Sequence, residues 1–282
     1  MKRNFLKNLG VEYTHKKISI LIQIISVTKE GAKFSNEQIK ALIKSVSTYI
    51  NSVDKLDNSK ELFGEININP KNENIENLTF YKYISKSTCD NFISKGKFQF
   101  GSLKYYREIE RDESRDEKEG YSNLVFENLD RQFFTSVISG FNYYILCGTN
   151  TLTHEEYMSD QFGDYVMKIK NIKSFAESVK KSIGAKSWAC QKVNYSDFKS
   201  NIIRTELDNF EGAKPDLSPE IFELIKNNSI DSSVFTKPTS FESENEVRLI
   251  FEMDKNSKKK LNIVNQGLLD NIEIIKITAN KK

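Results

Sequence analysis

Three glutamates alternate in residues 241–251, FESENEVRLIF, just before a run of apolar residues. Glu242, Glu244 and Glu246 share one side of an extended chain, because side chains two residues apart lie on the same face of a strand. Carboxylates this close repel one another, so the spacing is typical either of a carboxylate site or of an acidic strand screened by water. Arg248 follows on the same face, where it pairs with Glu246 or binds a phosphate.

The pair Glu244 and Glu246, at the entry to an apolar strand, resembles the E-x-E motif of ADP-ribosyltransferases. In that superfamily the second glutamate starts a core strand, holds the ribose of NAD and stabilises the oxocarbenium-like state as nicotinamide leaves. The resemblance implies Glu246 as the catalytic carboxylate, Glu244 as the residue that positions or activates the acceptor, and NAD as the substrate.

The same resemblance implies a set of NAD-contacting residues. The first core strand of these enzymes presents an Arg or His, and the second presents Ser-Thr-Ser or a Tyr. The corresponding stretches here read FYKYIS and KFQFGS, the latter followed by LKYYR, and an arginine in the charged insert that follows would grip phosphate. The resemblance implies Lys82 or Tyr83 in place of the usual Arg or His, together with Ser102 and Tyr106. The charged insert adds Arg107, the arginine nearest to the predicted pocket.

A second resemblance extends over residues 78–253. The order YKYIS, KGKFQFGSLKYYR, MSDQFGDYVMKIK, VNY and FTKPTSFESENEVRLIF is similar to an uncharacterised bacterial domain family with members that look like toxin or phage-defence proteins. The family's Asn-Asp-Pro after the second strand is missing, and residues 107–119 stand there instead. Together the resemblances imply an anti-phage ADP-ribosyltransferase toxin. Its acceptor would be RNA, with mRNA favoured, single-stranded DNA or a protein of translation, and its partner an antitoxin or chaperone.

Two other functions fit the same residues. A metal-dependent nuclease would bind Mg²⁺ through clustered acids, although the D…E-x-K spacing of that class is missing. A binding protein without catalysis would present the acidic strand as an exposed edge. No P-loop, GxGxxG or HExxH is present, and no metal site is expected from the two histidines. The nuclease would use Glu242, Glu244, Glu246, Asp112 or Asp116, and Lys237.

The strands that must position these residues are rich in aromatic and β-branched side chains. Because short strands alternate with short helices, the sequence predicts an α+β fold with a mixed or antiparallel sheet. The resemblance implies that this sheet is of ADP-ribosyltransferase type. The predicted helices cover residues 35–53, 87–94, 171–183 and 217–227, with Ser35 or Asn36 and then Ser87 as the first two N-caps. The predicted strands are 78–84, 96–102, 133–138, 142–148, 164–170, 188–195, 246–253 and 272–278.

Composition and patterning predict three regions. Residues 1–63 form a small helical region that packs on the rest of the protein or docks a partner. Residues 64–77 are polar and contain Pro70, which is typical of a linker. Residues 78–282 form the third region, which the resemblance implies to be an ADP-ribosyltransferase-like catalytic domain.

Charge and cysteine content limit the class of protein. The 282 residues hold 42 basic and 39 acidic side chains, so the net charge is +3, which excludes a strongly basic nucleic-acid coat and a polyacidic tail. Three cysteines without a CxxC pair favour a reducing cytoplasm over a disulfide framework. The most apolar run, residues 18–27, is too short to span a membrane, and no membrane partner is expected.

Overall fold

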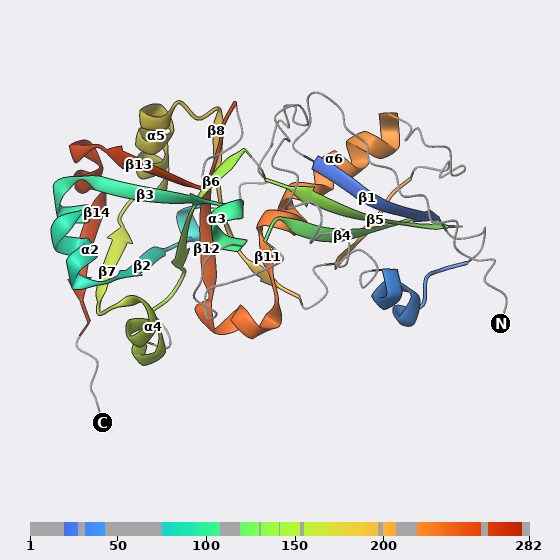
Figure 1. The fold of residues 1–282 in the computed structure, drawn as a ribbon, viewed down its shortest axis with the longest axis horizontal. Helices are drawn as coiled ribbons and strands as arrows, with labels where there is room; N and C mark the ends of the chain where they lie inside the picture. Colours follow the sequence, from blue (N-terminus) through green and yellow to red (C-terminus); the bar gives the residue numbers. More distant parts are fainter. Residues whose placement is uncertain are drawn as a thin grey trace. The chain divides into compact units, whose positions relative to one another are not determined.

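The chain folds into two compact units, each built from separate stretches of sequence. Both contain a sheet and helices, which confirms the predicted α+β class (Figure 1). Unit 1 consists of Met1–Ile68, Lys118–Gly140 and Ser196–Pro238, and unit 2 of Asn69–Glu117, Phe141–Tyr195 and Thr239–Lys282. The computed structural model describes residues 20–27, 32–42, 75–107, 119–129, 131–140, 142–152, 155–196, 200–206, 219–254 and 259–277.

Unit 1 differs from the predicted N-terminal region because it also takes two segments from within the predicted catalytic domain. Strand β1 (Ile20–Val27) pairs antiparallel with β5 (Gln132–Ser139), so this part of residues 1–63 is a strand and not helical. The run of isoleucines suits a strand, since β-branched side chains pack well on a pleated surface. Of the predicted linker, only η2 (Ile75–Asn77) lies within the described residues.

The sheet of unit 1 has the order β1-β5-β4-β10 and is mixed. Strand β4 (Tyr121–Glu127) is antiparallel to β5 and parallel to β10 (Ser200–Arg204). Helix α6 (Pro219–Val234) packs on one face through small buried serines, and the hydroxyls of Ser139 and Ser233 are hydrogen-bonded. These serines bring the helix close to the sheet.

The opposite face of this sheet is covered by the predicted N-terminal helix. Its described part, residues 36–42, follows Ser35, and the Gln38 N–H donates to Ser35 Oγ while the Ser35 N–H donates to Gln38 Oε1. This reciprocal capping confirms Ser35 as the N-cap. Leu42 packs in a cluster with Val125 and Phe134, so the apolar face of this segment is used inside unit 1.

The sheet of unit 2 has eight strands and divides at β6 (Tyr143–Thr149). One edge of β6 pairs along its length with β12 (Glu246–Glu252), which pairs in turn with β8 (Ser187–Lys192). The other edge pairs with β3 (Lys97–Ser102) near Ile145 and with β2 (Phe80–Ile84) at Thr149. The two strands therefore separate from β6 in different directions.

Both branches of the sheet end in C-terminal strands. Strand β13 (Lys260–Val264) pairs with β3, whereas β7 (Tyr165–Ile169) pairs with both β2 and β14 (Ile272–Lys276). All pairings in this sheet are antiparallel. The remaining helical segments of unit 2 are α2 (Lys86–Asn91), η3 (Ile93–Lys95), α3 (Leu103–Arg107), α4 (Glu155–Phe162), α5 (Ile172–Ile183), η5 (Thr239–Glu244) and η6 (Gln266–Asn271).

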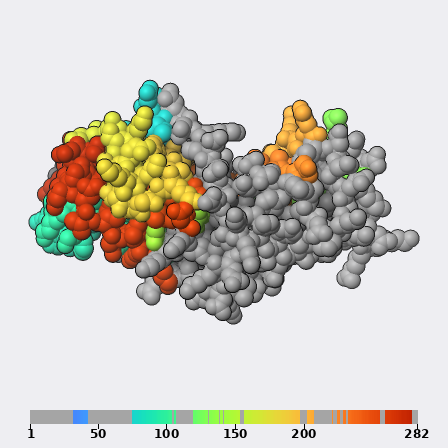
Figure 2. Space-filling model, turned by 90° about the horizontal axis from the view of Figure 1, so that it is seen from above, coloured from blue at the N-terminus to red at the C-terminus, as the bar shows by residue number. Residues whose placement is uncertain are grey.

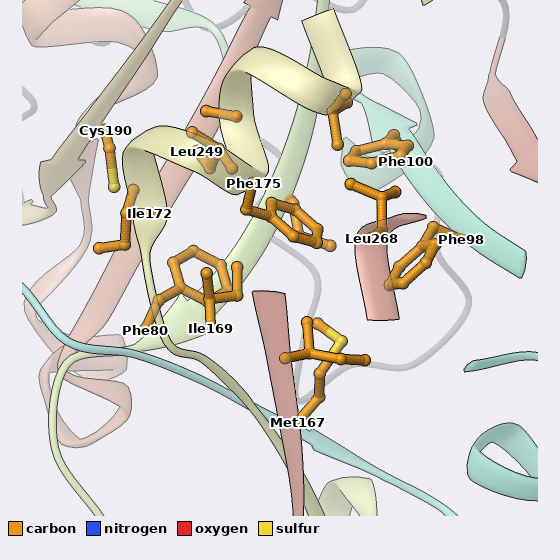
Figure 3. Packing of buried hydrophobic residues seen from close by; sticks show 14 of the residues in the cluster. Phe80, Phe98, Phe100, Met167, Ile169, Ile172, Phe175, Cys190, Leu249 and Leu268 are labelled. Carbon is orange, nitrogen blue, oxygen red and sulfur yellow. The ribbon is translucent and has the colours of Figure 1, made fainter. Parts of the chain in front are cut away.

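Helix α5 covers the main apolar face of unit 2. Asn171 caps it by accepting from the Ser174 N–H, and Gly184 ends it at a φ of 67°. Phe175 reaches into the middle of the core, where it meets Phe98 edge to face, as Figure 3 shows. At the surface, α5 lies beside the C-terminal segment, with Asn265 donating to Ser182, so distant parts of the sequence share one face in Figure 2.

All eight predicted strands are present, with ends shifted by one or two residues, and the last residues of 188–195 form the separate short β9 (Asn194–Tyr195). Strands β1, β4, β10 and β13 were not predicted, nor was the short β11 (Thr236–Lys237). Helix α2 is capped by Ser85 and not by Ser87, because Ser85 is the residue whose hydroxyl accepts from the Thr88 N–H. Within the described residues, no helix is long and apolar enough to cross a membrane.

Replacing Phe175 by Ala should lower the free energy of unfolding of unit 2 by about 3–5 kcal/mol, because the ring is fully buried and its loss leaves a cavity. Urea unfolding followed by Trp188, the single tryptophan of the chain, measures this effect within unit 2. Phe92→Ala is the matched control, since this ring is 52% exposed and its removal should change stability by at most about 0.5 kcal/mol. Equal effects of the two substitutions would contradict the assignment of the core.

Candidate active site

Glu246 is the first residue of β12, an interior strand of the sheet, and its side chain is 4% exposed. Val247, Leu249 and Phe251 point into the α5-covered core. Alternation places Glu246 and Arg248 on the opposite face of the strand. The predicted position of Glu246 at the start of a core strand is therefore observed.

The strand begins at Glu246 because Asn245 turns the chain. Asn245 has a φ of 43°, in the left-handed region that asparagine tolerates better than most residues. Its side-chain amide donates to Thr151 Oγ1 at 2.7 Å, and its carbonyl accepts from the Asn150 N–H at 3.0 Å. The Glu246 N–H donates to the Tyr195 hydroxyl at 2.7 Å. These bonds fix where the Glu246 side chain leaves the backbone.

The prediction that Glu242, Glu244 and Glu246 share one face of a strand is wrong. Residues 239–244 form the 3-10 helix η5, and the Asn245 N–H closes its end on the Glu242 carbonyl at 3.1 Å. Glu242 is exposed and Glu244 is half-buried, whereas Glu246 is buried. The left-handed turn at Asn245 ends the two-residue alternation, so the three carboxylates do not lie on one strand face.

Arg248 forms an ion pair with Glu246 inside the sheet. Its Nε lies 2.7 Å from Glu246 Oε1 and its Nη2 lies 3.5 Å from Oε2. The arginine is 2% exposed, so neither partner of the pair relies on water. Of the two predicted roles of Arg248, the ion pair to Glu246 is confirmed.

Lys82 and Tyr106 enter the region where β2 and β3 separate from β6. The Lys82 amine donates to the Cys147 carbonyl at 2.9 Å, and the Tyr106 hydroxyl donates to the Ile145 carbonyl at 3.5 Å. Both carbonyls belong to the edge of β6 along which its pairing passes from β3 to β2. Two side chains thus bind backbone oxygens where the sheet divides.

Two glycines allow this arrangement. A Cβ at Gly148 would lie 2.5 Å from the Phe80 ring and 2.6 Å from the Tyr81 carbonyl, so its absence lets β2 cross close to β6. A Cβ at Gly101 would lie 2.7 Å from the Tyr105 ring and 2.8 Å from the Tyr106 ring. The bare backbone at Gly101 therefore lets α3 fold back over β3 and brings Tyr106 to the site.

The charges of the site shift the pKa values of its other members. Burial lowers the pKa of the Lys82 amine, while the nearby Cys147 and Glu246 act in the opposite direction. Burial, and then the Glu246 carboxylate, raise the pKa of the Cys147 thiol, against the effect of Arg248 and Lys82. Burial also raises the pKa of the Tyr106 phenol well above 10, helped by Cys147. Tyr106 and Cys147 are consequently protonated at neutral pH.

The Cys147 thiol lies in the electrostatic environment shared by the Tyr106 phenol and the Glu246 carboxylate. Besides burial, Cys147 and Glu246 both raise the pKa of the phenol, and Glu246 raises the pKa of the thiol. All three cysteines are free thiols, and Cys147 is the half-buried one. The cross-strand register places Cys147 directly beside Arg248.

Two other predicted residues, Tyr83 and Ser102, do not join this group. Tyr83 packs with Met158, Val166 and Ile277, and neighbouring side chains along β2 point to opposite faces, so Lys82 and not Tyr83 lies beside Glu246. Ser102 accepts from the Tyr105 N–H and so starts α3. Arg107 is the last residue of α3.

Of the residues of the alternative nuclease, the three glutamates belong to unit 2, where they do not share a strand face. Lys237 is buried in unit 1, where its carbonyl accepts from the Ser196 N–H, and Asp112 and Asp116 lie outside the described residues. No group of three or more His, Cys, Asp or Glu side chains that could hold a metal ion occurs among the residues described.

Sequence reasoning missed three residues that position Glu246: Asn245, Thr151 and Tyr195. The only signal was the tyrosine of the VNY stretch, which the second resemblance quoted without assigning it a role. A hydrogen bond between Tyr195 and Glu246 joins residues far apart in the chain, and no spacing rule predicts it.

Replacing Glu246 by Gln should make Cys147 react faster with iodoacetamide at about pH 8.5, near the pKa of a free thiol. The carboxylate opposes a second negative charge beside it, so its removal lowers the pKa of the thiol. Peptide mapping by mass spectrometry gives the rate for each cysteine, and Cys89 is the internal control. An unchanged or slower rate at Cys147 would contradict the electrostatic contact.

Comparison with known proteins yields no match: no family model matches the chain, and neither a curated protein nor a solved structure is significantly similar to it. The case for a function therefore depends on the residues of unit 2 and on their geometry.

Proposed function

We propose that unit 2 is an NAD-dependent ADP-ribosyltransferase with Glu246 as its catalytic carboxylate. The observation that carries the proposal is the buried Glu246 at the start of an interior strand, paired with Arg248. The fold proposed for unit 2 is accordingly of ADP-ribosyltransferase type. The position of this glutamate agrees with the place of the second glutamate in the E-x-E motif.

The chemistry needs a fixed negative charge near the ribose. As the bond between ribose C1′ and the nicotinamide nitrogen breaks, its electron pair leaves with nicotinamide and positive charge develops on the ribose. A carboxylate held in a site of low dielectric stabilises that charge more strongly than it would in water. The acceptor nucleophile then bonds to C1′ and gives up its proton. Glu246 is suited to the first step.

Lys82 and Tyr106 support the proposal from the neighbouring elements. The resemblance expects a cation from the first core strand, and Lys82 of β2 lies close enough to Glu246 to interact electrostatically. It also expects a tyrosine near the second strand, and Tyr106 of α3 follows β3 and interacts with the same glutamate. In this proposal Lys82 neutralises charge on NAD, and Tyr106 contacts the nicotinamide end as a neutral phenol.

Glu244 is proposed to act on the acceptor. It is half-buried at the end of η5, across the Asn245 turn from Glu246, and is therefore nearer to water than the catalytic carboxylate. We further propose a nucleic acid, with mRNA first, or a protein of translation as acceptor, and an anti-phage toxin role with an antitoxin or chaperone. These finer points depend on the resemblance.

The alternatives receive less support from the geometry. A nuclease would need several carboxylates around one ion, and Glu242 and Glu244 leave the strand that carries Glu246. A binding protein with an exposed acidic edge would need β12 at the border of the sheet, whereas β12 pairs on both sides. No specific observation favours either function.

The central experiment is transfer from labelled NAD to bulk RNA, single-stranded DNA, duplex DNA and cell lysate. Replacing Glu246 by Gln should reduce labelling at least about 100-fold, the size of effect typical for removing a transition-state contact. Glu252→Gln is the matched control, since Glu252 is buried on the same strand face and accepts from Ser187 Oγ. Equal labelling by the wild type and Glu246→Gln would refute the assignment.

Replacing Glu244 by Gln should separate the two halves of the reaction. Because Glu244 is proposed to serve the acceptor, labelling of the macromolecule should fall at least about tenfold while nicotinamide release to water persists. Nicotinamide release is measured by chromatography in the same samples, and the exposed Glu242→Gln serves as control. Loss of both activities in parallel would place Glu244 in NAD cleavage instead.

A further inference from the structure

Arg248 is the largest fully buried side chain of the described residues and stands in the interior of a sheet. A guanidinium has no neutral form at accessible pH, so its burial is tolerated only where an anion and good acceptors surround it. The anion is Glu246, two residues earlier on the same strand face. Arg248 and Glu246 therefore stabilise each other's charge in the interior.

The pair is rigid because both members belong to one strand. Residues two apart on one face are separated by about 7 Å along the strand, and β12 is held by pairing with both β6 and β8. The Asn245 turn and the bond from the Glu246 N–H to Tyr195 fix the start of the strand. Little conformational freedom remains to be lost when the carboxylate meets its partner.

The two oxygens of Glu246 are held unequally. Oε1 receives a close hydrogen bond from Arg248 Nε at 2.7 Å, whereas Oε2 lies 3.5 Å from Nη2. Both contacts come from one guanidinium, so the carboxylate is held in one orientation. This is the geometry that a group acting on a developing positive charge requires.

We propose that Arg248 is the positioning residue of the site: it keeps the Glu246 carboxylate ionised and holds it in one orientation. The catalytic part of this inference rests on the proposed function, because only there does Glu246 act on a substrate. The structural part concerns Glu246 alone and holds or fails without NAD. Arg248 reaches the reaction through Glu246 and does not bind the phosphates of the substrate.

The test compares Arg248→Met, Arg248→Lys and wild type by two independent readouts. The first is ¹³C NMR of labelled glutamate carboxyls across pH, with Glu246 assigned from Glu246→Gln. In Arg248→Met the midpoint of the Glu246 titration should move upward by at least about one pH unit, because the arginine cation is gone. In Arg248→Lys the midpoint should return most of the way to the wild-type value, since lysine supplies a positive charge. An identical titration in wild type and Arg248→Met overturns the proposal.

The second readout is the pH profile of transfer. At about pH 7, kcat should fall at least about tenfold in Arg248→Met, with the acid limb displaced to higher pH and KM nearly unchanged. A rise in KM at constant kcat would show instead that Arg248 binds substrate, and would overturn the proposal. If the wild type transfers nothing, the proposed function fails while the NMR result still decides the structural part.

A folding control keeps the test decisive. Arg248→Met removes the arginine cation from beside a buried carboxylate and should lower the unfolding midpoint. Glu246→Gln/Arg248→Met removes both charges and should recover at least about half of that loss. If Arg248→Met does not fold, folding of the double variant supports mutual dependence and Arg248→Lys supplies the titration. If the decreases in unfolding midpoint of the two single variants simply add in the double variant, the proposal is overturned.

Discussion

Every side chain of β12 is buried, although the strand carries two glutamates and an arginine. Water cannot solvate these charges, so the structure must neutralise them from within, and the pair between Glu246 and Arg248 does this at the start of the strand. At its other end, Glu252 accepts from Ser187. The stability of the unit therefore depends on the position of each polar group near these charges, because an unpaired ion lowers the folding stability far more in the interior than at the surface.

The division of the sheet at β6 supplies the second half of the site. Where the pairing of β6 passes from β3 to β2, its carbonyls accept from Tyr106 and Lys82 and not from a neighbouring strand. A buried backbone oxygen needs a donor, so the branch point itself calls for polar side chains. The features that satisfy the fold at this point are the same ones that surround the candidate carboxylate. The same polar side chains therefore satisfy the backbone carbonyls of β6 and surround the proposed catalytic carboxylate.

The two units share a discontinuous chain. Each sheet collects strands that are distant in sequence, as in the pairing of β1 with β5 in unit 1 and of β13 with β3 in unit 2. Such pairings carry a large loop-closure cost before they contribute stability, which favours slow, cooperative folding. The N-terminal residues contribute a strand to unit 1. The antitoxin or chaperone of the proposed toxin role would therefore dock on a surface built from several segments of the chain.

Local pattern alone predicted much of this protein. The β-branched and aromatic residues located all eight predicted strands, and the apolar spacing located α5. The polar residues before residue 37 located the start of the N-terminal helix to within one residue, because each of these signals acts over a few residues. The same reasoning singled out Glu246 at the start of its strand. It failed for Glu242 and Glu244, since the left-handed turn at Asn245 is held by Thr151 and Asn150, which lie far away in the sequence.

Only the tertiary structure decided which residues meet. Where the sheet branches, the Lys82 side chain of β2 reaches a carbonyl of β6, and Lys82 rather than Tyr83 therefore lies beside Glu246. Cys147 joins the site because the strand register places it opposite Arg248. The assignment of the N-terminal strand to a sheet from the middle of the chain was equally invisible in the sequence. Register and branching depend on the packing of the whole unit, and no short window of residues encodes them.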